Sequence, residues 1–266
     1  MAPLKEKMKL GLFIPCYNVA KDIPLVLTAI GDAPCLERIH TVLAIDNHSQ
    51  DATVECLLSF GSKIPRLKDK LIVLKNAVNY GLGGSQKIAF QYFLDKNFTH
   101  VIIVHGDNQG NAKEIATQFL KTYDKNPSVD LIIASRFMSQ SDISGYNRLR
   151  TLGNHCFNFL TWVLTGHWMS DSGAGIIFIK TEALRHIPFG DLTNGFHFNP
   201  QLNILLYSHP GIHIKEIPLI WKDSQDKPAI WSLKYCLELL KILFHYRWRL
   251  FNRVSEKFKP ISTQAK

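Results

Sequence analysis

The sequence predicts an α/β fold built on a mostly parallel, doubly wound sheet. Short runs of apolar and β-branched residues alternate with segments of helical periodicity along most of the chain. Of the first four runs, three end in Asp or Asn, and the third leads into a glycine-rich helix start. Because parallel strands end at one edge of a sheet, we expect a ligand site at that edge.

The first half of the chain contains four predicted strands, each followed by a helix. Runs of four or five apolar residues between polar turns are typical of buried parallel strands. Pro24 suits the first turn of a helix, where its missing N–H is not needed. The predicted strands are residues 10–14, 41–45, 71–74 and 101–104, and the helices begin near Asp22 or cover residues 53–60, 86–94 and 113–123.

The pattern changes after a fifth predicted strand at residues 130–135. Residues 138–145 are polar and turn-rich and predict a mobile loop. The next apolar segment, residues 152–164, is rich in Phe, Trp and Leu and predicts a helix. The remaining predicted elements are a strand at 176–179, a short helix after Lys180, a helix at 201–208 and an edge strand at 212–217, which ends at Pro218.

Composition favours one globular body with anionic partners. The chain has 266 residues, 46% of them hydrophobic and 20% charged, which is enough to bury a large core. Its formal net charge is +9, which favours nucleotide diphosphates, phospholipid headgroups or nucleic acid as partners. Nucleic acid is the least favoured of the three, because cations and aromatics are not interleaved on a recognisable platform.

Cysteine usage and apolar run lengths indicate a protein of the reducing cytosol. The 5 cysteines are scattered and never form a C-x-x-C pair, which argues against a disulfide framework and against a structural zinc site. Residues 1–9 are short and basic and lack the apolar core of a signal peptide. No run approaches the roughly 20 apolar residues of a spanning helix.

The strand at residues 101–104 opens directly into the polar sequence His105-Gly106-Asp107-Asn108-Gln109. Asp107 therefore stands where ligand-binding residues of open α/β sheets are found. Alternatively, Asp and Asn only form the turn here. Asn79 to Ser85 is a glycine-rich turn before a helix, where glycines let the backbone approach a ligand and leave N–H groups for an anion. A tight strand-to-helix turn also favours glycine.

The C-terminal segment, residues 230–254, predicts one long amphipathic helix. Basic residues recur every three or four positions on an otherwise apolar rod that contains Trp231, Phe244 and Trp248. The helix either packs on the domain or on a second copy, or it lies as a cationic helix on an anionic membrane. We therefore divide the chain into a first domain, residues 1–228, and a basic C-terminal helix and tail, residues 229–266.

Six motifs together point to a known family. They are Ile14 to Asn18, Ile45 to Thr53, Asn79 to Gly84, His105 to Gln109, Ala134 to Phe137 and Asp171 to Gly173. In this order and spacing they resemble the landmarks of family 2 inverting glycosyltransferases. The chain most resembles the branch that contains dolichol-phosphate mannosyltransferase and bacterial polyprenyl-phosphate glycosyltransferases. The resemblance covers roughly residues 9–220.

This resemblance implies a GT-A fold that binds a nucleotide-diphosphate sugar and a divalent metal, Mg²⁺ or Mn²⁺. His105, Asp107 and Gln109 fall on the family's Asp-x-Asp-x-Gln metal motif, and oxygen ligands suit a hard dication. Arg136 is implied to contact phosphate. The implied nucleotide-sugar contacts are Pro15, Tyr17, Asn18, Asp46, Asn47, Ser49, Asn79, Gly81, Gly83, Gly84, His105, Gly106 and Asp107.

The acceptor side is implied by a basic pair. Arg148 and Arg150 match two basic residues that precede the acceptor-side helix in the family, and they could hold a lipid phosphate by forked hydrogen bonds. A hydroxyl acceptor needs a general base, for which Asp171 is the best candidate, although it could equally cap the following segment. The expected catalytic residues are therefore Asp107, Asp171 and Arg136.

Two departures from the family pattern affect the expected site. His105 replaces the first acidic residue of the metal motif, and Val19 stands where the family usually has Glu. The expectation is a metal-dependent inverting transferase, cytoplasmic or peripheral at the cytoplasmic face of the membrane, that acts on a polyprenyl phosphate or a cell-surface glycan precursor. The sequence is compatible with a homo-oligomer and does not decide the oligomeric state. The alternatives are a catalytically impaired nucleotide-sugar-binding or membrane-associated adaptor and, on the shared nucleotide-binding sheet, a nucleotidyltransferase.

Overall fold

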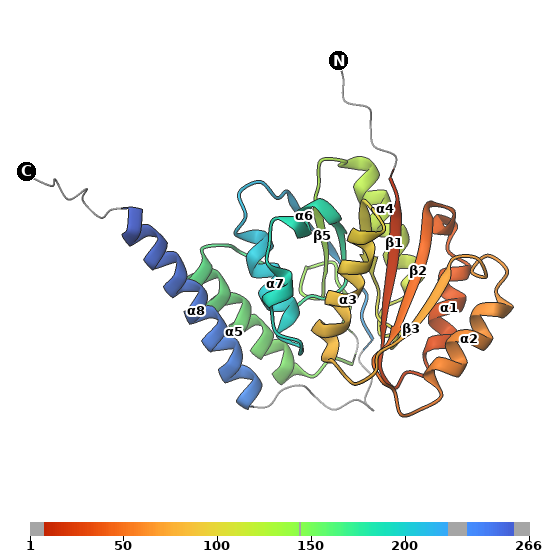
Figure 1. The fold of residues 1–266 in the computed structure, drawn as a ribbon. Helices are drawn as coiled ribbons and strands as arrows, with labels where there is room; N and C mark the ends of the chain where they lie inside the picture. Colours follow the sequence, from red (N-terminus) through yellow and green to blue (C-terminus); the bar gives the residue numbers. More distant parts are fainter. Residues whose placement is uncertain (1–7, 144, 223–232, 258–266) are drawn as a thin grey trace, which may run out of the picture.

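The computed structural model describes residues 8–143, 145–222 and 233–257. It has helices on both faces of a twisted sheet, and α5 and α8 lie side by side at the end of the molecule away from α1 and α2 (Figure 1). The strands are β1 Leu10–Cys16, β2 Ile39–Asp46, β3 Leu71–Lys75, β4 His100–Ile103, β5 Leu131–Ser135, β6 Ile177–Lys180 and β7 Ile214–Pro218. The predicted α/β fold with a mostly parallel sheet is confirmed.

The helices follow the predicted order. The α-helices are α1 Ile23–Gly31, α2 Thr53–Lys63, α3 Gly81–Asp95, α4 Ala112–Lys125, α5 Arg148–Thr165, α6 Thr181–Arg185, α7 Phe198–Tyr207 and α8 Leu233–Lys257, and short 3₁₀ helices cover Pro34–Arg38 and Phe189–Asp191. The starts of α3, α5 and α7 were predicted too late, at residues 86, 152 and 201. In α3, the residues interpreted as a glycine-rich turn form the first helical turn, and in α5 the predicted basic pair lies within the first helical turn.

The sheet places β1 at the centre of its parallel half. Its strand order is β3-β2-β1-β4-β6-β5-β7. β1 is parallel to both β2 and β4, whereas β6 is antiparallel to both of its neighbours, β4 and β5. The carboxyl ends of β1, β2, β3 and β4 therefore meet at one edge, where the polar motifs follow them.

Alternation along β1 divides the core into two layers. Leu10, Leu12 and Ile14 face the layer under α1, α2 and α4, and Phe13 faces the layer that contains Phe93 of α3. Gly11 is required here because a Cβ at this position would lie 2.2 Å from the Phe93 ring. Helices therefore cover both faces of the sheet, as the doubly wound prediction requires.

α8 packs on the rest of the protein along one side. Its Leu243 is fully buried in a cluster with Met169 and Ile204, against which Phe157 and Tyr246 also pack. This confirms that the helix contacts the domain, although its other side is exposed. The start of the predicted helix and the proposed boundary between residues 228 and 229 lie outside the described residues. Within those residues, no helix has the length and apolarity needed to cross a bilayer.

His100, at the start of β4, is buried among aromatic rings. Its ring centroid lies 4.9 Å from that of Tyr123 and 5.3 Å from that of Phe178, and its Nδ1 is 2.8 Å from Thr99 Oγ1. Burial lowers the pKa of His100 from 6.5 to about 4, and the nearby charge of Lys180 acts in the same direction. The folded protein therefore keeps this imidazole neutral at moderately acid pH.

We expect the pH dependence of stability to change when His100 is replaced. Below pH 6.5 the unfolded chain takes up a proton that the folded chain does not, so stability falls as the pH decreases from 6.5 toward 4. Between pH 6.5 and pH 5, His100→Phe should lose about 2 kcal/mol less unfolding free energy than the wild type. Urea unfolding at both pH values measures this, and equal losses in the two proteins would contradict it.

Candidate active site

The ends of β1, β2 and β4 bring two predicted carboxylates close to one thiol. Cys16 pairs in register with Asp46, and the N–H of Gly106 donates to the carbonyl of Pro15 at 3.3 Å. Burial raises the pKa of the Cys16 thiol, and the charges of Asp46 and Asp107 raise it further. The loops after β2 and β4 therefore direct negative charge toward the same point at the end of β1.

Hydrogen bonds join the loop after β1 to the loop after β2. The N–H of Asn18 donates to Ser49 Oγ at 2.9 Å, and the N–H of Gln50 donates to Asn18 Oδ1 at 2.8 Å. Asn18 adopts a φ of 50°, which Asn tolerates better than most residues. Tyr17, between these anchors, is 48% exposed. The two loops thus form one rigid rim on which the Tyr17 ring is accessible to a ligand.

Asn47 connects this rim to the loop after β3. Its Nδ2 donates to Asn79 Oδ1 at 2.7 Å, and its Oδ1 accepts from Asn76 Nδ2 and from the N–H of Tyr80, both at 2.9 Å. Asn76 Nδ2 also donates to Ser85 Oγ in the first turns of α3. Asn47 is 5% exposed, so it fixes the loops relative to one another.

The glycines of α3 accommodate a segment of the protein itself. A Cβ on Gly81 would lie 2.4 Å from the carbonyl oxygen of Asn194, and a Cβ on Gly83 would lie 2.5 Å from that of Thr193. The N–H of Gly81 donates to Asn79 Oδ1 and the N–H of Gly84 to the Asn194 carbonyl. These glycines therefore permit the close approach of residues 193–195, and a role of the turn in binding an anion stays a prediction.

Gly81 is expected to tolerate no side chain. Its φ of 77° and the close carbonyl of Asn194 both oppose a Cβ, so Gly81→Ala should reduce the unfolding free energy by about 2 kcal/mol. Gly190→Ala is the matched control because no atom lies within 4 Å of its added Cβ, and its effect should stay within about 0.5 kcal/mol. Equal denaturation midpoints for the two variants would contradict this assignment.

The predicted metal ligands share the loop after β4. Asp107 and Gln109 are partly exposed at the edge, and Asp107 Oδ1 accepts from the Gln109 N–H at 3.3 Å. The His105 ring packs edge-on against Trp221, with centroids 5.9 Å apart. Across residues 8–143, 145–222 and 233–257, no group of three or more His, Cys, Asp or Glu has an arrangement that would hold a metal by itself. A carboxylate and an amide oxygen fit a hard dication that takes its other ligands from water and a diphosphate.

Arg136 and Asp171 form a buried ion pair beside this edge. Asp171 Oδ2 accepts from Arg136 Nε at 2.7 Å and from its backbone N–H at 3.1 Å, and Oδ1 accepts from Nη2 at 2.8 Å. The Asp171 side chain is 1% exposed. Burial alone would lower the pKa of Arg136, but the charge and hydrogen bonds of Asp171 outweigh it and raise the pKa. Asp171 therefore holds and orients a permanently charged guanidinium, a geometry that favours a positioning role over general-base catalysis.

Tyr146 links this ion pair to the predicted acceptor arginines. Its hydroxyl accepts from Arg136 Nη1 at 3.3 Å and from Asn154 Nδ2 at 3.2 Å. The guanidinium of Arg150 lies over the Tyr146 ring, 4.5 Å from the centroid. Arg148 and Arg150 lie in the first turn of α5, rather than before the helix as predicted. Arg150 is brought toward Arg136, whereas Arg148 is exposed.

The sequence analysis did not predict that two aromatic residues from distant segments, His197 and Tyr235, lie near Arg136. The His197 and Tyr235 rings stack with centroids 4.3 Å apart, and His197 Nε2 lies 3.6 Å from a Glu238 carboxylate oxygen. Burial raises the pKa of Tyr235 to about 12, while the charge of Arg136 opposes the shift. The first turn of α8 therefore reaches the Arg136 region. No local motif marks this contact, because it joins residues far apart in the chain.

Replacing Asp171 should destabilise the protein strongly. Asp171→Asn leaves the buried Arg136 guanidinium without a counter-charge, so we expect a loss of about 3 kcal/mol in unfolding free energy. Asp124→Asn is a matched control, since Asp124 pairs with Arg38 at 2.8 Å but both side chains are well exposed, and its loss should stay below about 1 kcal/mol. Chemical denaturation measures both variants, and similar losses would show that the buried pair has no special structural role.

Comparison with known sequences decides the family. The sequence model described as glycosyl transferase family 2 matches residues 12–187. The chain belongs to this family. The matched region runs from β1 to the end of α6, and it includes Asp46, Asp107, Arg136 and Asp171. Family membership confirms the predicted class of enzyme, a glycosyltransferase.

Two relatives and one solved structure illustrate the similarity. An uncharacterized protein of Methanocaldococcus jannaschii is 25% identical over 215 residues, which cover 80% of this chain and 82% of that protein. The UDP-N-acetylglucosamine–dolichyl-phosphate N-acetylglucosaminyltransferase of Methanococcus voltae is 21% identical over 182 residues, which cover 65% of this chain and 70% of that one.

The solved structure is glucosyl-3-phosphoglycerate synthase from Mycobacterium tuberculosis in complex with Mn²⁺, UDP-glucose and phosphoglyceric acid. It superimposes with a TM-score of 0.62 at 14% identity and covers 96% of this chain and 82% of that chain. The present chain therefore has the GT-A fold, as expected from its motifs.

Proposed function

We propose that this family 2 glycosyltransferase moves a hexosyl group from a nucleotide-diphosphate sugar to a phosphate-bearing lipid acceptor, with inversion at the anomeric carbon. One observation carries the proposal. Asp107 lies partly exposed at the end of β4, beside the joined loops of β1 and β2 and near a second carboxylate, Asp46. This edge suits a ligand that combines a nucleotide base with a metal-bound diphosphate.

The donor side has features that suit a nucleotide base. Tyr17 offers an exposed aromatic face, on which a base can stack. Asp46 is fully buried, and its Oδ2 accepts from the N–H of Ser49 at 3.1 Å. Its Oδ1 is buried and has no hydrogen-bond partner among the described residues.

Asp107 and Gln109 would hold Mg²⁺ or Mn²⁺ together with oxygens of the diphosphate, and His105 contributes the third side chain of the motif. When bound, the cation would neutralise the charge that develops on the leaving diphosphate. The presence of Mn²⁺ and UDP-glucose in the M. tuberculosis enzyme supports this proposal. Imidazole in place of a second carboxylate lowers the negative charge of the site, so we expect weak metal binding before the donor binds.

The acceptor side is positively charged. Arg136 is kept charged by Asp171, and Arg150 lies beside it across the Tyr146 ring. Two arginines in the first turn of α5 oppose the helix dipole unless an anion binds there. The M. voltae relative is named for a dolichyl-phosphate acceptor, and phosphoglyceric acid is bound in the M. tuberculosis enzyme. Both names support an acceptor with a phosphate group.

A phosphate acceptor simplifies the chemistry expected of the protein. A phosphate oxygen is already anionic at neutral pH and attacks the anomeric carbon without a general base. Asp171 then needs only to orient Arg136, which agrees with its three hydrogen bonds to that residue. Residues of the chain bind and align the two substrates, and the bond to the diphosphate breaks in line with the attack. The reaction would take place at the cytoplasmic face of the membrane that contains the lipid.

A second candidate function follows from His105. With Asp107 as the only carboxylate of the loop motif His105 to Gln109, the protein could bind a nucleotide sugar without transferring it, as an adaptor. Thermal-shift measurements with nucleotide sugars, with and without Mn²⁺, combined with a turnover assay distinguish the two. Donor binding without release of nucleoside diphosphate supports the adaptor. Release of pyrophosphate would instead indicate a nucleotidyltransferase.

Asp107→Asn should abolish transfer while the protein stays folded. Loss of the carboxylate weakens metal binding at the diphosphate, so we expect turnover to fall by about 100-fold or more. The metal-dependent part of the thermal shift should disappear as well. Asp69→Asn, at an exposed carboxylate before β3 and away from the carboxyl edge, is the control and should retain full activity. Full turnover by Asp107→Asn would refute the proposed function.

A further inference from the structure

Two helices at one end of the molecule expose rows of apolar side chains. On α5, exposed hydrophobic residues recur at helical spacing of three or four positions. On α8 the exposed row contains Leu237, Phe244 and Trp248. The exposed residues of α5 are Leu149, Leu152, Phe159, Leu160, Trp162 and Val163. The helices pack side by side (Figure 1), and we call the outer side that these two rows flank the α5–α8 face.

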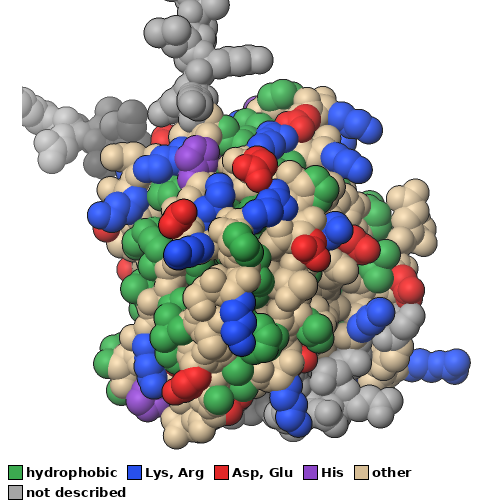
Figure 2. Space-filling view, turned by 90° about the vertical axis from the view of Figure 1, so that its right-hand side faces the viewer, with side chains coloured by type: hydrophobic (Ala, Val, Ile, Leu, Met, Phe, Trp, Pro, Cys, Tyr) green, Lys and Arg blue, Asp and Glu red, His purple; other side chains and the backbone are tan. Residues whose placement is uncertain are grey.

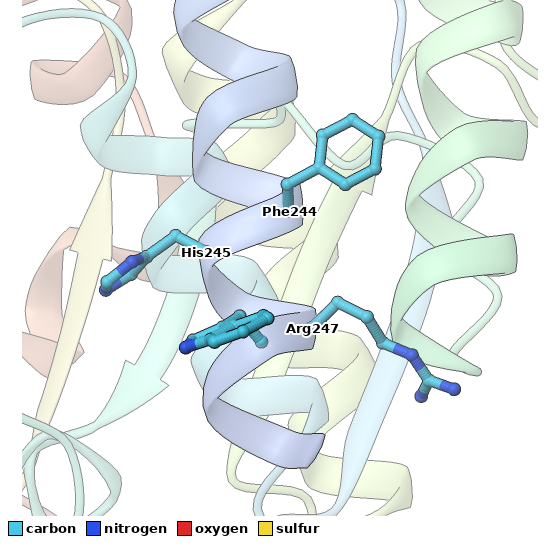
Figure 3. Close-up of a pocket in the computed structure, with 4 residues that line it drawn as sticks. Phe244, His245 and Arg247 are labelled. Atoms are coloured by element: carbon cyan, nitrogen blue, oxygen red, sulfur yellow. The ribbon is translucent and has the colours of Figure 1, made fainter. Parts of the chain in front are cut away.

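Four neighbouring side chains of α8 lie at an open surface, namely Phe244, His245, Arg247 and Trp248. Phe244 and Arg247 extend to the side of α8 on which α5 is drawn, and His245 extends to the other side (Figure 3). An aromatic ring and a guanidinium therefore stand together at a surface that nothing in the described part of the chain covers.

The charges of the α5–α8 face are almost all positive. α5 contains no Asp or Glu, and between residues 235 and 248 α8 contains only Glu238, which lies beside His197. Exposed basic side chains on the same helices are Arg148, Lys241 and Arg247. At the opposite end of the molecule, acidic and basic side chains are interspersed (Figure 2). Apolar and cationic groups without acidic ones are therefore a property of this face and not of the whole surface.

We propose that the α5–α8 face docks on the surface of an anionic phospholipid bilayer. Leucine and aromatic side chains would enter the headgroup region, while arginine and lysine would contact lipid phosphates. Tryptophan, present as Trp162 and Trp248, is favoured at this depth of a membrane. The choice of a lipid surface as the occupant rests on the proposed function, in which the acceptor is a lipid. The location of the α5–α8 face on the protein does not depend on that function.

Charge argues against a second copy of the chain as the occupant. A two-fold symmetric dimer would bring this face onto itself, so Arg247 and Lys241 would approach the same positive groups of the partner. An anionic bilayer offers the complementary charge instead. The α5–α8 face also adjoins the proposed acceptor site, because the first turn of α5 contains both Leu149 on the face and Arg150 beside Tyr146. This position favours a membrane that contains the lipid acceptor.

Vesicle flotation tests the docking face without any donor or acceptor. The wild type should float with vesicles of phosphatidylcholine and phosphatidylglycerol, should float much less with phosphatidylcholine alone, and should be released by salt. Leu152→Glu on α5 and Phe244→Glu on α8 should each lower binding about 10-fold. Leu58→Glu on α2 is the matched control, because Leu58 is 57% exposed and Leu152 is 59% exposed, and its binding should equal that of the wild type.

Three outcomes would overturn the proposal. These are no flotation of the wild type, equal loss of binding in all three variants, or a dimer by light scattering that Leu152→Glu dissociates while vesicles bind nothing. Circular dichroism melts confirm that the variants are folded, since all three positions are exposed. Donor-induced thermal shifts are measured on the same samples. Donor binding without flotation refutes only the docking face, whereas flotation without donor binding counts only against the proposed function.

Discussion

The site depends on the parallel pairing of β1 with both β2 and β4 at the centre of the sheet. Because of this pairing, three strands end at the same edge of the sheet. At that edge Cys16 pairs with Asp46, and the Gly106 N–H donates to the Pro15 carbonyl. A shift of one residue in either register would move every following side chain to the other face of the sheet. The positions of Tyr17 and Asp107 are therefore set by the ladder of hydrogen bonds rather than by the loops themselves.

Electrostatics divides the edge into two sides. Asp46 and Asp107 supply negative charge after β2 and β4, and Arg136 and Arg150 supply positive charge between β5 and α5. Under the proposed function, a donor that binds with its metal on the first side would place its sugar toward the second. Asp171 permits this arrangement because it keeps a guanidinium charged in a buried position, where an unpaired cation would be costly.

Local patterns predicted the strands and the polar edge, because apolar periodicity and Asp or Asn after a strand are short-range signals. The start of α3 was misjudged because its glycines were interpreted as a turn, and their close tertiary contact with Asn194 leaves no local signal in the sequence. The stacking of Tyr235 on His197 joins segments that share no pattern. The role of Asp171 required knowledge of its partner, since a carboxylate before Ser-Gly fits a cap or a base equally well in sequence.

Residues 193–198 contact α3 at one end and α8 at the other. At one end, Thr193 and Asn194 lie against the glycines of α3; at the other, His197 stacks on Tyr235 of α8. This short connection thus joins the glycine-rich start of α3 to the C-terminal helix. Insertions or deletions that loops usually accept would disturb packing against two helices here at once, so this connection tolerates less change in length than its position at the surface suggests.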